Sequence, residues 1–217
     1  PDAEQVIIAM GSVCEAIEEV VDYLNAAGEK LGLIKVRLYR PFVAKYLLDV
    51  IPSTVKTISV LDRTKESAAI GEPLYLDVVA ALHDKNIQIV GGRYGLSSKN
   101  TTPSDTAGVY KMLATELKNN FTIGINDDVT NLSLDIDNSY RLNNNNYEML
   151  IYGYGSDGMV STSKDILRII GDNTKKYVQG YFQYDSKKSG GVTRSHIRIS
   201  DKSIHKPYYV ENAKVVV

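Results

Sequence analysis

The most constraining feature of this sequence is a regular alternation of short apolar runs with helical patterns along its first 125 residues. The first run, residues 6–12 (VIIAMGS), is continuously apolar, which is typical of a strand buried on both faces of a parallel sheet. The next segment places Val13, Ile17 and Val20 at helical spacing, and Gly28 supplies a stop. The chain therefore begins with a strand and a helix in close succession.

The same pattern continues for four more strands. The further predicted strands are residues 31–39, 55–62, 87–95 and 121–125. The predicted helices between them are residues 43–51, 72–86 and 102–118. Strands and helices that alternate with short connections predict an α/β fold, in which an open, mostly parallel sheet carries helices on both faces.

A polar segment, residues 126–147, breaks this rhythm. It carries four consecutive asparagines and no sustained apolar period, so we predict a linker there. A second strand–turn–helix unit begins at residue 148, and residues 176–188 and 193–200 indicate further strands. The sequence thus predicts one domain over residues 1–125 and part of a second α/β domain over residues 148–217.

Charge and composition exclude several classes of protein. The chain has 25 basic and 26 acidic residues, a formal net charge of −1, which argues against a nucleic-acid partner because phosphate binding needs a concentrated positive surplus. No apolar run approaches the roughly 18 residues of a membrane helix. The acidic start without Met is expected of a cut fragment rather than a signal peptide. A single cysteine excludes an internal disulfide and suggests a reducing, cytoplasmic location.

Arginines follow three of the predicted strands. They are Arg37, Arg63 and Arg93. Ligands of open α/β sheets bind beyond the carboxyl ends of the strands, and guanidinium groups suit phosphate or carboxylate. The alternative is that these arginines form ion pairs with Asp62, Glu66, Glu72 or a neighbouring domain. We favour ion pairing, because charge clusters are often structural.

A glycine motif opens the second unit. Gly153, Gly155 and Gly158 match G-x-G-x-x-G between an apolar strand and a helical pattern, the context in which helix amides can hold a pyrophosphate. The carboxylate expected about 20 residues later is missing, since Asp172 lies in a Gly-Asp-Asn turn. The sequence therefore favours a tight strand–helix turn over a dinucleotide site.

Other candidate groups are weaker. Lys187, Lys188 and Arg194 surround Gly190-Gly191, where a basic hairpin is favoured over an anion site. Cys14 starts a helix but has no nearby histidine, so a small core residue is the favoured interpretation. The sequence shows no metal-ligand spacing of histidines and no nucleophile signature, and we assign no catalytic or metal-binding residue.

Long strings of the sequence resemble signature segments of pyruvate:ferredoxin (flavodoxin) oxidoreductases. They are GSVCEAIEEVVDYLNAAGEKLGLIKVRLYRPF, VLDRTKESAAIGEPLYLDV, VGGRYGLSSK, FTIGINDDVTNLSL and IYGYGSDGMVSTSKDILRIIGDNTKKYVQGYFQYDSKKSGGVTRSHIR. They cover nearly the whole chain in order. One departure is that the EPG expected after DRTK here is Glu66-Ser67-Ala68.

The resemblance implies a segment of a large enzyme. Such enzymes decarboxylate pyruvate on thiamine diphosphate with Mg²⁺ and pass electrons through 4Fe–4S clusters to ferredoxin or flavodoxin, giving acetyl-CoA from coenzyme A. It implies that residues 1–125 are similar to the C-terminal domain of transketolase and that residues 148–217 begin the γ-type domain. It implies no cofactor within this segment.

The implied partners are the remaining domains of the enzyme and a second copy in a homodimer. The strand-end arginines would then meet neighbouring domains or, alternatively, coenzyme A phosphates. Two other hypotheses stay open: a stand-alone nucleotide-binding or scaffold module, and a transketolase-type subunit whose thiamine partner is another chain.

Overall fold

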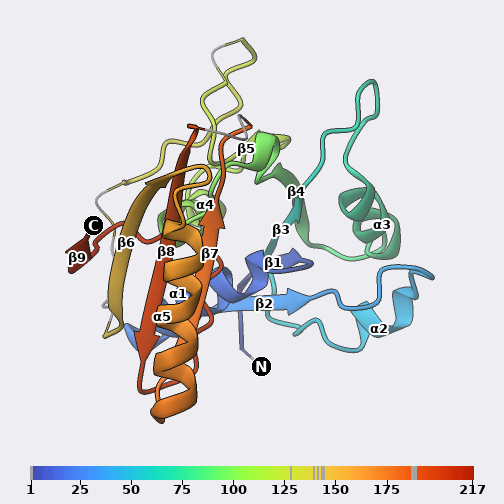
Figure 1. The fold of residues 1–217 in the computed structure, drawn as a ribbon. Coiled ribbons are helices and arrows are strands. Elements are labelled where there is room, and N and C mark those ends of the chain that lie inside the picture. Colours follow the sequence, from blue (N-terminus) through green and yellow to red (C-terminus); the bar gives the residue numbers. More distant parts are fainter. Residues whose placement is uncertain (1, 128, 139, 141, 143–144, 187–189) are drawn as a thin grey trace. The chain divides into compact units, whose positions relative to one another are not determined.

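A five-stranded sheet with the strand order β2-β1-β3-β4-β5 organises the first part of the chain, and every neighbouring pair is parallel. The strands are β1 (Gln5–Ala9), β2 (Leu31–Lys35), β3 (Thr57–Asp62), β4 (Gln88–Arg93) and β5 (Phe121–Thr122). The computed structural model describes residues 2–127, 129–138, 140, 142, 145–186 and 190–217. The chain divides into a first unit, Pro1–Leu142, and a second unit, Asn143–Val217 (Figure 1).

Helices cover both faces of this sheet, as predicted. They are α1 (Val13–Ala26), α2 (Ala44–Leu48), α3 (Pro73–Ala81) and α4 (Pro103–Ala114), with a short 3₁₀ helix, η1 (Leu96–Ser98). Successive strand residues point to opposite faces: Ile7 and Ala9 pack in one core with α1 and α4, whereas Val6 and Ile8 pack in another with α3. The sheet is therefore buried on both sides, which explains its continuous apolar strands.

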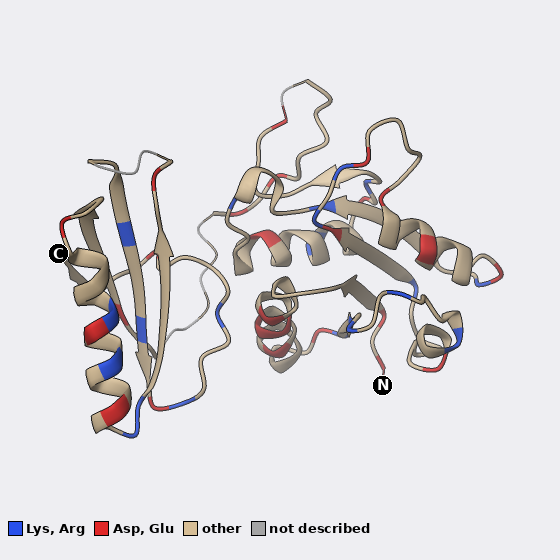
Figure 2. Ribbon diagram, turned by 45° about the vertical axis from the view of Figure 1, so that its right-hand side comes forward, with Lys and Arg blue, Asp and Glu red and all other residues tan. Residues whose placement is uncertain are grey.

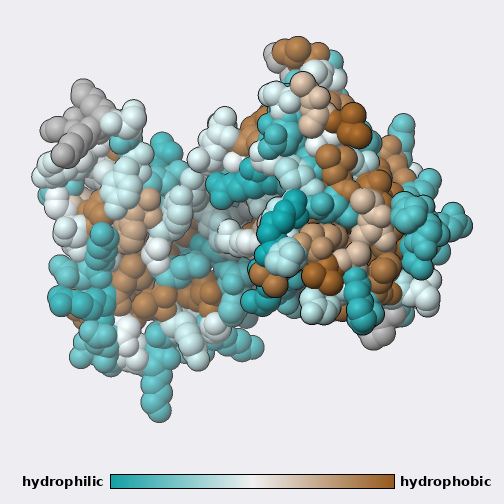
Figure 3. Space-filling view, turned by 90° about the vertical axis from the view of Figure 1, so that its right-hand side faces the viewer, coloured by the Kyte–Doolittle hydropathy of each residue, from teal (hydrophilic) through white to brown (hydrophobic). Residues whose placement is uncertain are grey.

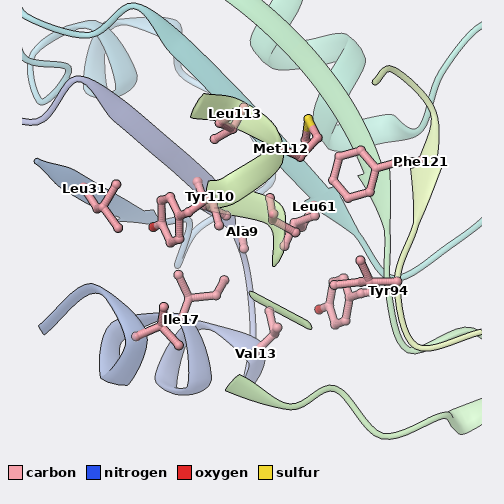
Figure 4. Close-up of a cluster of buried hydrophobic side chains, with 14 of the residues drawn as sticks. Ala9, Val13, Ile17, Leu31, Leu61, Tyr94, Tyr110, Met112, Leu113 and Phe121 are labelled. Atoms are coloured by element: carbon pink, nitrogen blue, oxygen red, sulfur yellow. The ribbon is translucent and has the colours of Figure 1, made fainter. Parts of the chain in front are cut away.

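The core between the sheet, α1 and α4 is filled by large side chains (Figure 4). Ile17 and Phe121 are completely buried, and the buried Tyr110 donates its hydroxyl hydrogen to the Gly32 carbonyl at 2.8 Å. Burial raises the pKa of Tyr110 far above its usual range. The Phe121 ring occupies the space where Gly92 would carry a side chain, so this strand position requires glycine.

Part of the segment expected as a linker packs on the first unit. The Leu134 amide donates to the Thr122 carbonyl at 3.0 Å, and Ile136 lies against Gly108 of α4. Leu134, Ile136 and Leu142 are partly buried against the core. These apolar residues hold the segment against the first unit, although they form no sustained helical or strand period. The limits of the predicted domains stay a prediction.

The second unit is a mixed sheet with one helix. Its elements are β6 (Tyr147–Tyr154), α5 (Met159–Asn173), β7 (Tyr177–Gln183), β8 (Val192–Ser200) and β9 (Val215–Val216). The strand order is β7-β8-β6-β9; β8 is antiparallel to both β6 and β7, and β9 is parallel to β6. The predicted strand–turn–helix start is confirmed.

Acidic and basic residues are interspersed along both units, with acidic residues gathered along α1 (Figure 2). Hydrophobic side chains reach the surface on the face of the first unit that carries α2 and α3 (Figure 3). Among them, Leu38 and Tyr46 are each 68% exposed and Val50 is 56% exposed. In the described residues, no helix is both long and apolar enough to span a membrane.

Candidate functional site

The charged cluster at the carboxyl edge of the first sheet begins with Asp62, the last residue of β3. The residue is 2% exposed, and its carboxylate accepts the backbone N–H groups of Leu74 and Tyr75, both at 3.1 Å. Those amides belong to the first turn of α3, where the helix dipole favours a negative charge. Burial raises the pKa of Asp62, and the two amide bonds oppose that rise. Asp62 therefore ties strand β3 to the start of α3.

Glu72 forms the second tie of this cluster. Its side chain is 3% exposed and forms an ion pair with Arg93, whose side chain is 12% exposed. Glu72 Oε2 also accepts the backbone N–H of Glu66 at 2.7 Å, and Arg93 Nη1 donates to the Asn120 carbonyl at 2.9 Å. A pair this deeply buried and this well hydrogen-bonded fixes the loop before α3 to strand β4.

Arg63 and Arg37 lie in exposed positions of the same edge. The Arg63 side chain lies against Gly95: a Cβ placed on that glycine would be only 2.9 Å from Arg63 Nε. Arg37 lines a surface pocket of about 410 Å³ with Gly11, Ser12 and Lys35. Within the described part of the chain, neither guanidinium has an ion pair. Of the three predicted arginines, the structure thus places one in an internal pair and leaves two exposed.

Cys14 lines the same pocket but is buried in the core, at 5% exposure. Burial raises the pKa of its thiol, which disfavours the reactive thiolate. The favoured interpretation, a small core residue, agrees with this position.

The glycine motif forms a tight turn, and a carboxylate of the turn itself accepts hydrogen bonds from its backbone amides. The Asp157 carboxylate accepts the backbone N–H of Tyr154 at 2.6 Å and that of Met159, the first residue of α5, at 2.8 Å. These bonds lower the pKa of Asp157. Gly158 has a φ of 89°, and a Cβ at Gly153 would come within 2.8 Å of Asp157 Oδ2. A carboxylate at this helix end would repel a pyrophosphate.

The two glycine loops of the second unit lie together. The Gly155 amide donates to the Gly191 carbonyl at 2.8 Å, and the Gly190 amide approaches the Gly155 carbonyl at 3.5 Å. Arg194 lies on β8, while Lys187 and Lys188 lie outside the described residues. The two loops lie far apart in the sequence, so the sequence did not predict that they form hydrogen bonds with each other.

The Asp157 turn gives a direct prediction. Asp157→Ala should speed hydrogen exchange of the Tyr154 and Met159 amides severalfold, because both lose their acceptor. Asp157→Asn, which keeps one acceptor oxygen, should give an intermediate rate. Exchange measured by NMR on both variants checks this, and unchanged rates in the alanine variant would contradict the capping role.

In the portion of the chain that is described, no group of three or more His, Cys, Asp or Glu side chains could hold a metal ion. The contacts described at the carboxyl edge and the glycine turn are hydrogen bonds and an ion pair. Their chemistry suits the positioning of backbone and the contact of charged surfaces.

Comparison with known proteins gives two family matches. The family model described as pyruvate:ferredoxin oxidoreductase core domain II matches residues 3–106, and that described as pyruvate ferredoxin/flavodoxin oxidoreductase matches residues 148–217. The chain is 54% identical to pyruvate:ferredoxin oxidoreductase of Moorella thermoacetica and 52% identical to pyruvate-flavodoxin oxidoreductase of Trichormus variabilis. It is 50% identical to a probable pyruvate-flavodoxin oxidoreductase of Escherichia coli. Each comparison covers 100% of this chain and 19% of the relative, so the chain spans about a fifth of their length.

Proposed function

Because the chain belongs to the pyruvate:ferredoxin/flavodoxin oxidoreductase family, we propose that it is a segment of an enzyme that oxidatively decarboxylates pyruvate. In that reaction pyruvate and coenzyme A give acetyl-CoA, CO₂ and electrons, which pass to ferredoxin or flavodoxin. The observation that carries the proposal is the succession of the two family matches, with identities of 50–54% to the three named relatives across the whole chain.

Within such an enzyme we assign this chain a structural role between domains. The buried charges of the carboxyl edge are engaged with each other: Asp62 with the start of α3, and Glu72 with Arg93. Arg37 and Arg63 are exposed and are proposed to contact neighbouring domains. Leu38, which precedes α2, and Tyr46, within α2, are exposed and give the first unit an apolar surface that supports the same role.

The cofactors of the reaction do not fit the residues of this chain. A 4Fe–4S cluster takes four thiolates, whereas the chain has one cysteine, which is buried. In the described residues no group of three or more His, Cys, Asp or Glu side chains could hold a metal ion, and the family resemblance implies that the thiamine-binding domains lie elsewhere in the enzyme. We therefore propose that thiamine diphosphate and the clusters bind elsewhere in the complete enzyme.

The domain assignment follows the same proposal. Residues 1–125 would form the domain similar to the C-terminal domain of transketolase, and residues 148–217 would begin the γ-type domain. The two family matches support a first domain that contains residues 3–106 and a second that begins at residue 148. Ferredoxin or flavodoxin as electron acceptor, assembly as a homodimer and a cytoplasmic location belong to the proposal for the complete enzyme.

The activity test compares the chain with the complete polypeptide that contains it. The purified chain should give no pyruvate-dependent viologen reduction with thiamine diphosphate and coenzyme A added, because the groups that carry the chemistry are cofactors bound elsewhere. The complete enzyme should turn over under the same conditions. Turnover by the chain alone would contradict the structural role, and a complete enzyme inert towards pyruvate would contradict the activity.

The role of Arg63 is tested by charge reversal in the complete enzyme. Arg63→Glu should lower the melting temperature of the complete enzyme but not that of the isolated chain, because this exposed guanidinium lacks an ion pair within the described residues of its own unit. The Michaelis constant for coenzyme A should stay unchanged. Arg168→Glu is the control: it reverses an exposed arginine whose ion pair, with Asp165 of the same helix, is itself exposed and so contributes little to stability.

The opposite outcome would assign Arg63 to ligand binding. A Michaelis constant for coenzyme A raised at least tenfold, or about 1.4 kcal/mol, with an unchanged melting temperature would show that Arg63 contacts coenzyme A.

A further inference from the structure

The sheet of the second unit carries its own helix on one face. In Figure 1, α5 lies along the sheet formed by β6, β8 and β7. A Cβ at Gly180 of β7 would collide with Leu167 of α5, and Gly153 of β6 faces Met159 at the helix start. These glycines therefore mark the covered face, and the alternate residues of each strand point to the opposite face.

Half of the opposite face is covered by the chain's own C-terminal segment, residues 206–210. Arg198 of β8 pairs with Glu148 of β6 at 2.7 Å and donates to the Tyr208 carbonyl at 2.8 Å. The His196 ring stacks on Tyr209 with centroids 4.8 Å apart. Arg198, Glu148 and His196 are only 2%, 5% and 5% exposed.

The His196 ring is held in the neutral form under this cover. Its Nδ1 accepts the backbone N–H of Val210 at 3.1 Å, and its Nε2 lies 2.8 Å from Gln183 Oε1. Burial, followed by the nearby Arg198 and Arg194, lowers the pKa of His196 to about 4. The covered half is thus a buried polar network that reaches as far as His196.

The other half of this face is open. It consists of Tyr152, Tyr154, Val192 and Arg194, and we call it the open half. The register pairs Tyr152 with Arg194 and Tyr154 with Val192, so the four side chains adjoin on neighbouring strands. Tyr152, Tyr154 and Val192 are 42%, 63% and 44% exposed.

Arg194 gives the open half a positive charge. Its guanidinium carbon lies 5.7 Å from the centre of the Tyr152 ring, and it has no carboxylate partner among the residues that the structure describes. Tyrosine and arginine are the residues enriched at the centres of protein interfaces. A sheet face also differs from the concave sites that small molecules prefer. The composition and shape of the open half therefore fit a protein surface.

We propose that the open half is the contact surface for another part of the same enzyme polypeptide. That part would cover Tyr152 and Tyr154 with apolar side chains and place a carboxylate against Arg194. The inference rests on the proposed function, because the chain accounts for only 19% of the length of its relatives, and these contain the polypeptide that could cover it. A sheet with both faces covered is also the stable arrangement of a domain.

Hydroxyl-radical footprinting of the isolated chain and of the complete enzyme tests this proposal. Oxidation of Tyr152 and Tyr154 should be at least fivefold slower in the complete enzyme. Equal rates in the two samples would overturn the proposal. Protection that grows with the concentration of the isolated chain would assign the surface to a second copy, and protection that requires added ferredoxin or flavodoxin would assign it to the electron acceptor; either result overturns the proposal.

A matched pair of variants gives a second readout. The double change Tyr154→Ser and Arg194→Glu should lower the melting temperature of the complete enzyme by several degrees and leave that of the isolated chain unchanged. Tyr147→Ser is the control, because Tyr147 lies on β6, is 42% exposed like Tyr152, and faces the α5 side. An equal effect of the control and the double variant would overturn the proposal.

The activity assay keeps this inference separate from the proposed function. An inactive complete enzyme in which Tyr152 and Tyr154 are protected would contradict the proposed reaction but not the contact surface. An active enzyme in which both tyrosines oxidise as fast as in the isolated chain would contradict only the contact surface.

Discussion

Replacing Glu72 with alanine should lower the free energy of unfolding of the first unit by about 3 kcal/mol, because it leaves the Arg93 charge buried without its partner. The variant also removes the acceptor of the Glu66 amide. Hydrogen exchange of β3 and β4 amides under native conditions measures the loss, since these strands exchange only through large openings.

The control for Glu72 is an exposed pair of the same unit. Glu18→Ala removes the partner of Lys35 at 2.6 Å, where the Glu18 side chain is 49% exposed, and should cost less than about 1 kcal/mol. The double variant Glu72→Leu with Arg93→Met should lose less than Glu72→Ala, because neither charge stays buried alone. If Glu72→Ala and Glu18→Ala lowered the free energy of unfolding equally, the Glu72–Arg93 pair would contribute little to stability.

Replacing Arg198 with methionine should destabilise the second unit by about 3–5 kcal/mol. Glu148, 5% exposed, would keep its charge without a partner, and the carbonyls of Lys206 and Tyr208 would lose their donor. The hydrogen-exchange rates of the amides in residues 206–210 should increase as the free energy of unfolding falls. Urea denaturation of the isolated chain, followed by exchange at single residues, measures both.

Arg194→Met is the matched control on the same strand. Arg194 is exposed and lies outside the covered half, so the isolated chain should lose less than about 1 kcal/mol. If Arg198→Met left the exchange of residues 206–210 unchanged, those residues would be held by contacts other than the guanidinium.

The sequence predicted the fold of the first unit because short, mostly apolar segments alternate with helical patterns, as a sheet covered on both faces requires. Element ends were less predictable. The second strand, expected over residues 31–39, ends at Lys35, since its partner β1 ends at Ala9, opposite Lys35. The helix expected over residues 102–118 ends at Ala114. The end of β2 therefore depends on a neighbour that lies elsewhere in the chain.

The sequence predicted where the charged residues of the candidate site lie, but not which of them form an ion pair. Parallel strands must deliver Arg37, Arg63 and Arg93 to one edge, whereas the choice of Glu72 as the partner of Arg93 depends on how α3 folds back. The tight turn at the glycine motif was predicted, but the role of Asp157 as acceptor of its amides was missed, although an aspartate just before a helix is a capping signal.

The Glu148–Arg198 pair was also missed. A charged residue within each of two apolar strands was the available signal, but only the register brings the two side chains together.

The loop between β3 and α3 is anchored at both ends. The residues between the anchors can therefore change with little effect on the stability of the fold. Asp62 fixes the start of this loop and Glu72 fixes its end, while the tip, including Ile70 at 87% exposure, lies in solvent. Since loop closure costs only about 0.6 kcal/mol per doubling of length, related enzymes can vary this tip by insertion or deletion without unfolding the domain. The same tip is a suitable place to insert an epitope tag or attach a fluorescent probe.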